Sequence, residues 1–160
     1  MKTKAIYPGT FDPLTNGHVD IVERAAQIFE HVYFAVADST SKKTLFTTQE
    51  RMSLADEALK QTLNVSVISF DKLTVDCARE NEALVILRGL RTVTDFEYEL
   101  QLASMNRKLY PDAETMFLTP DEKFSCISSS LVREIAQLDG DVSELVPANV
   151  LAALNKKLSK

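Results

Sequence analysis

The 160-residue chain has few of the residues that build disulfide frameworks, metal clusters or basic nucleic-acid surfaces. Its two cysteines, Cys77 and Cys126, fit no metal-binding or redox spacing, so we expect two reduced thiols of a cytosolic protein. Lysine and arginine number 18 against 23 aspartate and glutamate residues, which gives a formal net charge of −5. This balance argues against a protein that binds nucleic acid through a broad basic face. It leaves anionic small molecules open, because a few cations in a cleft can oppose the net charge locally.

Long apolar runs are also missing. The longest, such as residues 32–37, are far shorter than the roughly 20 residues that a membrane span needs. The N-terminal stretch MKTKAIYPGTFD has lysines but no apolar segment behind them. We therefore expect neither a signal peptide nor a membrane-bound protein.

What is present is an alternation of strand and helix patterns. We expect strands at residues 4–7, 32–37, 64–70, 83–87 and 114–118, and helices at 17–31, 47–63, 73–81, 95–109, 128–138 and from 147 onward. Such alternation predicts parallel strands joined by crossover helices. We therefore expect an α/β fold with one doubly wound, parallel five-stranded sheet, in a single domain over residues 1–160. Ligands of such sheets bind beyond the carboxyl ends of the strands, so the loops after the strands form the candidate site.

The chain has only four glycines and five prolines, yet residues 7–18, YPGTFDPLTNGH, hold two of each. This stretch follows the first expected strand. Gly9 permits a positive φ or a close backbone approach, and Thr15 or Asn16 can cap the next helix. His18 lies in the first turn of that helix, where backbone N–H groups and the helix dipole attract an anion.

Thr10 and His18 could therefore meet one phosphate together with the backbone donors of this turn. The alternative is a tight strand-to-helix turn with an incidental exposed histidine. After the second strand, Lys42 and Lys43 stand beside three hydroxyl side chains and could contact another phosphate. A solvated polar loop is the alternative there.

The last two loops add cations and hydroxyls. After the fourth strand, Arg88 and Arg91 flank a glycine, and arginine offers a planar fork that matches phosphate oxygens. Glu97 or Glu99 on the following helix could hold an arginine, or could accept a hydrogen bond from a ribose or base. After the fifth strand, serines 128–130 open a helix; one hydroxyl can cap it and the others can bind an anion, although capping needs only one. Together these loops describe a site for a ligand with several phosphates.

Three segments in this order resemble a known family. Thr15 to His18, TNGH, is similar to the T/HxGH motif of the nucleotidylyltransferase superfamily, and Ile127 to Arg133, ISSSLVR, is similar to its second signature. With the RGLR loop and the helix DFEYELQLASMNRKL, they resemble the bacterial phosphopantetheine adenylyltransferases from the first strand to the last helix. The resemblance implies a Rossmann-like nucleotidylyltransferase fold and adenylyl transfer from ATP to 4′-phosphopantetheine, giving dephospho-coenzyme A and pyrophosphate. It also implies Mg²⁺ carried with ATP, a cytoplasmic homohexamer and feedback inhibition by coenzyme A.

Residue roles follow from the resemblance position by position. His18, Lys42 and Thr10 would be catalytic, with His18 stabilising the transition state. ATP would be bound by Thr10, Phe11, His18, Gly89, Leu90, Arg91, Glu99, Phe124, Ser125, Cys126, Ile127, Ser128, Ser129 and Ser130. Phosphopantetheine would be bound by Thr10, Lys42, Thr74 and Arg88. Thr74, Phe124 and Cys126 differ from the residues common in the family, which alters the pocket walls and leaves the phosphate chemistry unchanged.

The reaction that the resemblance implies needs no general base, because a phosphate monoester is already an anionic nucleophile. The enzyme has to align two polyanions and neutralise charge at phosphorus, and cations and helix N-termini suit both tasks. We expect magnesium to travel on the ATP phosphates, without a dedicated metal site on the protein. Two alternatives stay open: a relative that uses nicotinamide mononucleotide or glycerol 3-phosphate as acceptor, and a non-catalytic sensor of coenzyme A or adenine nucleotides.

Overall fold

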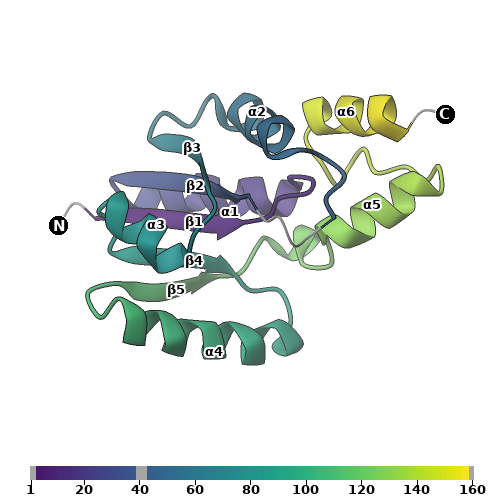
Figure 1. Cartoon of the computed structure of the whole chain (residues 1–160). Helices are drawn as coiled ribbons and strands as arrows, with labels where there is room; N and C mark the ends of the chain where they lie inside the picture. The colour runs from purple at the N-terminus through teal and green to yellow at the C-terminus, as the bar shows by residue number, and fades with distance from the viewer. Residues whose placement is uncertain (1–2, 39–42, 159–160) are drawn as a thin grey trace.

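The computed structural model describes residues 3–38 and 43–158, whose strands form one parallel sheet. Along the chain the strands are β1 (Lys4–Gly9), β2 (His31–Ala37), β3 (Val65–Phe70), β4 (Val85–Gly89) and β5 (Glu114–Leu118). They pair in the order β3-β2-β1-β4-β5, with every neighbouring pair parallel. The chain therefore winds outward from β1 in one direction and from β4 in the other (Figure 1). This order confirms the doubly wound α/β fold expected from the sequence.

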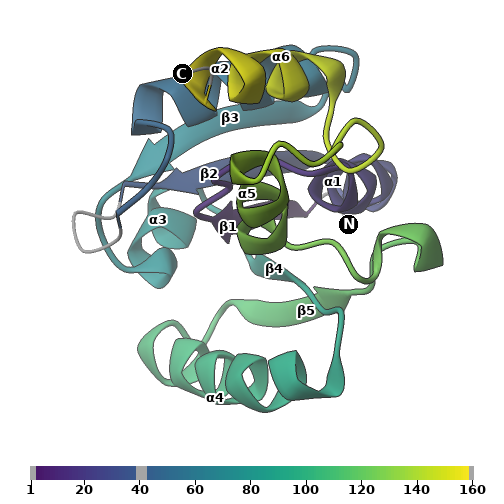
Figure 2. The same ribbon diagram turned by 90° about the vertical axis from the view of Figure 1, so that its right-hand side faces the viewer.

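Helices connect the strands and cover both faces of the sheet. They are α1 (Asn16–Ile28), α2 (Thr48–Leu59), α3 (Thr74–Glu80), α4 (Val93–Leu109), the short 3₁₀ helix η1 (Glu122–Phe124), α5 (Ser129–Gln137) and α6 (Ala148–Leu158). The larger core cluster takes buried residues from α1, α2, α5 and α6, and the smaller one takes them from α3. The two views show α6 beside α2, and α4 below β5 (Figures 1 and 2).

The alternation of side chains along β1 explains the two cores. Ala5 and Tyr7 belong to the larger cluster, whereas Ile6 belongs to the smaller one. Both faces of the central strand are therefore buried, as the continuous apolar pattern of parallel strands requires. In the part of the chain that the structure describes, no helix combines the length and the apolar character of a membrane span.

Hydroxyl side chains cap the N-terminal ends of three helices that follow the strand loops. Thr15 caps α1, and its partner in the capping box is the His18 side chain. Thr47 caps α2 in a capping box with Glu50, and Ser128 caps α5. Side-chain caps satisfy the backbone N–H groups that the first turn of a helix leaves unpaired. They also fix where each loop ends, so they position the loops that build the site.

Some boundaries differ from the sequence expectation. β4 continues through Arg88 and Gly89, which pair with β5, so these two residues belong to the strand and not to a loop after it. The helical pattern predicted up to residue 63 is wrong, because α2 ends at Leu59 and Leu63 is 96% exposed. The N–H of Thr62 bonds the Leu59 carbonyl, so a turn replaces the last expected helical turn.

Candidate active site

A cleft of about 300 Å³ opens at the carboxyl edge of the sheet, where β1 and β4 are neighbours. This is the point where the winding direction reverses, and doubly wound sheets bind their ligands there. The loop after β1, the start of α1, the end of β4, α4 and the start of α5 form its walls. The predicted site residues that line it are Thr10, Phe11, His18, Arg88, Gly89, Arg91, Glu99, Phe124, Ile127, Ser128, Ser129 and Ser130.

The other predicted residues are placed differently. Among the described residues, Leu90 does not line this cleft, and its N–H donates to a β5 carbonyl at 2.9 Å. Ser125 and Cys126 do not line it either, and Cys126 is an exposed cysteine with a free thiol. Thr74 is the first residue of α3. Lys42 lies outside the described residues.

The loop after β1 is shaped by the Phe11 ring. A Cβ atom on Gly9 would lie 2.7 Å from Phe11 Cζ, so Gly9 serves the close approach, whereas the positive φ lies at Phe11 itself (φ 50°). The Phe11 ring stacks on Phe34 with ring centroids 3.9 Å apart and is 5% exposed. Phe11 can therefore offer a ligand its main chain, while its side chain belongs to the core.

His18 is held as a neutral ring with a defined tautomer. The Thr15 N–H donates to His18 Nδ1 at 3.0 Å, which leaves the ring proton on Nε2. The pKa of His18 is lowered to about 4, mainly by burial and to a smaller extent by the charge of Arg91. The Phe11 ring meets the imidazole edge to face at 5.0 Å between centroids. His18 is thus a neutral N–H donor in the wall of the cleft at physiological pH.

Arg88 is anchored by Glu99. Its Nε and Nη2 donate to the two carboxylate oxygens of Glu99, each at 2.7 Å, and its Nη1 donates to the Pro8 carbonyl at 3.0 Å. Burial alone would lower the pKa of Arg88, but the paired carboxylate keeps it above the ordinary value. Three of the five guanidinium N–H groups are engaged in this way, so one on each terminal nitrogen remains for a ligand. Of the two roles predicted for Glu99, the structure shows that of holding an arginine.

Arg91 joins α4 to the chain just before α5. Its Nη1 donates to the Ile127 carbonyl at 2.9 Å, and its Nε lies 3.4 Å from Asp95 Oδ2. That oxygen is buried and accepts no hydrogen bond from the residues that the structure describes. Asp95 lines the cleft and was missed in the sequence, where its spacing from Arg91, i and i+4 at the start of a helix, was the available signal.

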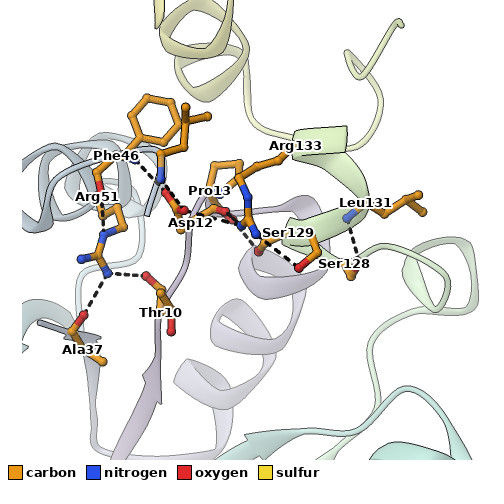
Figure 3. A network of polar contacts seen from close by, with 12 residues as sticks. Thr10, Asp12, Pro13, Ala37, Phe46, Arg51, Ser128, Ser129, Leu131 and Arg133 are labelled. Carbon is orange, nitrogen blue, oxygen red and sulfur yellow. Dashed lines mark hydrogen bonds and ion pairs between the residues drawn. The ribbon is translucent and has the colours of Figure 1, made fainter. Parts of the chain in front are cut away.

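The hydroxyl groups of serines 128–130 form hydrogen bonds within the protein. Ser128 Oγ accepts from the Leu131 N–H at 3.1 Å, and Ser129 Oγ donates to the Pro13 carbonyl at 2.8 Å (Figure 3). Ser130 Oγ accepts from Arg133 Nη2 at 3.4 Å. The Ser129 hydroxyl therefore docks α5 against the loop after β1, whereas the Ser128 and Ser130 hydroxyls bond within the N-terminal part of α5. The backbone N–H groups in the first turn of α5 lie at the cleft, and they are the donors that this helix offers to an anion.

Three charged residues next to the cleft were not singled out as site residues from the sequence. Arg133 Nη1 donates to the Asp12 carbonyl, and its charge lies 3.5 Å from Asp12 Oδ2. Asp12 is 3% exposed and Arg51 is 2% exposed. Burial lowers the pKa of the Arg51 guanidinium, and the charges of Asp12 and Asp38 oppose this.

Within residues 3–38 and 43–158, no group of three or more His, Cys, Asp or Glu side chains is placed to share a metal ion.

Comparison with known proteins identifies the family of the chain. Residues 6–135 match the cytidylyltransferase-like family. A phosphopantetheine adenylyltransferase of Methylococcus capsulatus is 55% identical over 159 residues, which cover 99% of this chain and 98% of that protein. A solved Vibrio parahaemolyticus structure, assigned as a nicotinate-nucleotide adenylyltransferase, has the same fold with a TM-score of 0.73 and 18% identity, over 99% of this chain and 95% of that one. The chain therefore belongs to the phosphopantetheine adenylyltransferase family of the cytidylyltransferase-like nucleotidyltransferases.

Proposed function

We propose that this enzyme transfers the adenylyl group of ATP to 4′-phosphopantetheine, with dephospho-coenzyme A and pyrophosphate as products. This is the penultimate step of coenzyme A biosynthesis. The observation that carries the proposal is the 55% identity to a phosphopantetheine adenylyltransferase over nearly the whole of both chains. The cleft supports it, because Arg88, Arg91, His18 and two helix N-termini converge there on one space.

In this proposal the acceptor phosphate attacks the α-phosphorus of ATP directly, in line with the departing pyrophosphate and without a covalent intermediate. The acceptor is already an anion, so the protein supplies orientation and charge stabilisation. The neutral His18 ring donates its Nε2 proton in a hydrogen bond to an α-phosphate oxygen, where charge develops. The Thr10 hydroxyl and the Lys42 ammonium act at the same phosphorus. Phe11 contributes its main-chain N–H, because its ring is buried in the core.

The two ligands divide the cleft. We propose that Arg88 gives its two remaining N–H groups to the phosphate of phosphopantetheine, while Glu99 keeps the guanidinium in place. The Arg91 charge and the first turn of α5 then serve the phosphates of ATP. Thr74, at the start of α3, would contact the pantetheine arm through its main chain. Leu90 and residues 124–127 would contact the nucleotide.

Further properties of the family are proposed for this chain on the same basis. Mg²⁺ prefers oxygen ligands and enters nucleotide sites with phosphates and water, so we propose that it arrives with ATP. We also propose a cytoplasmic homohexamer that coenzyme A inhibits. Exposed apolar side chains support self-association: on α4 and β5 they are Val93, Phe96, Tyr98, Leu100, Met105, Leu109 and Met116.

Pyrophosphate release from MgATP, measured with each of several acceptors, tests the substrate assignment. We expect release with 4′-phosphopantetheine and little with nicotinamide mononucleotide or glycerol 3-phosphate. Release with one of the other acceptors would change the assignment within the superfamily. Binding of ATP and coenzyme A without release from any acceptor would support a non-catalytic sensor instead.

A further inference from the structure

Two buried charged side chains lie beside the cleft without a ligand-binding role. Asp12 belongs to the loop after β1 and is 3% exposed; Arg51 belongs to α2 and is 2% exposed. Burying charge is costly unless hydrogen bonds compensate it fully. Both side chains meet this requirement through main-chain groups from several separate segments (Figure 3).

The Asp12 carboxylate holds the chain that precedes α2. Its Oδ2 accepts from the Leu45 N–H at 2.8 Å, and its Oδ1 accepts from the Phe46 N–H at 2.9 Å. Arg133 of α5 reaches the same residue through the Asp12 carbonyl. Asp12 thus connects the loop that carries Thr10 with two other segments that are far away in sequence.

The Arg51 guanidinium holds the same chain from the other side. Its Nη1 donates to the Thr10 carbonyl at 2.6 Å and to the Ala37 carbonyl at 2.9 Å. Its Nε donates to the Phe46 carbonyl at 3.2 Å, and its Nη2 donates to Thr48 Oγ1 at 2.9 Å. A single planar group therefore joins the Thr10 loop, the end of β2 and the residues that lead into α2.

We infer that Asp12 and Arg51 are positioning residues for adenylyl transfer. Arg51 bonds the Thr10 carbonyl directly, and Asp12 follows Thr10 by two positions in the same loop. The pair thereby fixes the loop that carries Thr10 against the end of β2 and the residues that lead into α2. This inference rests on the proposed function, in which the Thr10 hydroxyl acts at the α-phosphorus. A pair that only stabilised the fold would not affect turnover through Thr10.

Conservative substitutions separate positioning from folding. Asp12→Asn keeps the shape but replaces one carboxylate oxygen with an NH₂ group, which faces a backbone N–H donor. Arg51→Lys keeps the charge but offers one nitrogen where three now bond four acceptors. We expect either change to lower kcat by about 10²-fold, as misplacement of reacting groups on the order of 1 Å does. KM for ATP should change far less.

Asn64 offers a matched control at the opposite edge of the sheet. Its Nδ2 donates to the carbonyls of Ala26, Phe29 and Glu30, so it also ties separate segments together through backbone carbonyls. It precedes β3 at the amino ends of the strands, away from the cleft. Asn64→Ala should lower the urea midpoint of unfolding as Asp12→Asn and Arg51→Lys do, but it should leave kcat near the wild-type value.

A double-mutant cycle with Thr10→Ala tests the coupling. If Asp12 and Arg51 act by positioning Thr10, their substitution should lower kcat much less in the Thr10→Ala background, whereas Asn64→Ala should have the same small effect in both. Full multiplication of the separate losses overturns the inference, and so does an unchanged kcat in folded Asp12→Asn and Arg51→Lys. An unaltered kcat in Thr10→Ala overturns it too, since the loop would then hold no group that needs positioning. Wild-type enzyme without phosphopantetheine-dependent release would instead refute the proposed function itself.

Discussion

The His18 ring should stay uncharged at pH values well below the ordinary pKa of histidine. Burial lowers the pKa of His18 from 6.5 to about 4, with a smaller contribution from the Arg91 charge. The Thr15 N–H at Nδ1 adds to this, because a protonated ring could not accept that bond. In the ligand-free enzyme, His18 should therefore remain a neutral Nε2–H donor from pH 8 down to about pH 5.

The same pKa difference predicts how stability depends on pH. In the unfolded chain His18 takes up a proton near pH 6.5, whereas in the folded protein it does so near pH 4. The contribution to stability is therefore fully present above pH 6.5 and is lost as the pH falls towards 4. At about 1.4 kcal/mol for each pKa unit, the loss would approach roughly 3 kcal/mol. Because the half-buried ring borders an open cleft, we expect about 1–2 kcal/mol.

Proton NMR can measure this titration directly, because the chain has only two histidines. A His31→Gln variant assigns the remaining imidazole signal to His18. We expect its midpoint near pH 4 without ligand, and a higher midpoint with a non-hydrolysable ATP analogue, whose phosphate oxygens favour the charged ring. A midpoint near 6.5 in the ligand-free protein would refute the buried, Thr15-bonded arrangement. An unchanged midpoint with the analogue would show that the ring does not meet phosphate.

Further predictions concern single substitutions at the cleft. His18→Ala should lower kcat by about 10²-fold in steady-state assays, as loss of one preorganised donor does, and unchanged turnover would contradict its role. Arg88→Lys keeps a cation for Glu99 but loses the fork, so calorimetric titration should show phosphopantetheine binding weakened about 10-fold and ATP much less; equal losses would contradict the division of the cleft. Gly9→Ala places a Cβ atom 2.7 Å from the Phe11 ring and should destabilise the fold by about 1–3 kcal/mol in urea unfolding, whereas Gly17→Ala meets only ordinary contacts of 3.4 Å or more. Equal midpoints for the two glycine variants would show that the loop can move aside.

Features with a local cause were predictable from the sequence. The alternation of apolar patterns gave the order of strands and helices. Short polar side chains predicted Thr15 or Asn16 as the cap of α1 and one of serines 128–130 as the cap of α5, and the structure selects Thr15 and Ser128. The end of β4 was placed too early, because Arg88 and Gly89 carry no strand preference and are held there by pairing with β5. Such pairing is a tertiary effect that a local pattern does not contain.

The site shows the same limit. Residues on the loops after β1 and β4 were recognisable, since parallel strands bring their carboxyl ends to one edge. The bonds from Asp12 to Leu45 and from Arg51 to Thr10 join residues more than 30 positions apart, so no spacing rule could find them. The sequence allowed Glu99 either to hold an arginine or to accept a hydrogen bond from a ribose or base. The two bonds from Arg88 to its carboxylate show the first of these roles.

The stereochemical course of the reaction tests the central claim of direct transfer most directly. The substrate is ATP with sulfur in place of one non-bridging α-phosphate oxygen, in a single configuration, together with Mg²⁺ and 4′-phosphopantetheine. Direct in-line attack predicts a thio-substituted dephospho-coenzyme A with inverted configuration at the α-phosphorus, and one pyrophosphate for each product molecule. Retention of configuration would require a covalent adenylyl-enzyme between two displacements and would contradict the account, as would pyrophosphate release without this product.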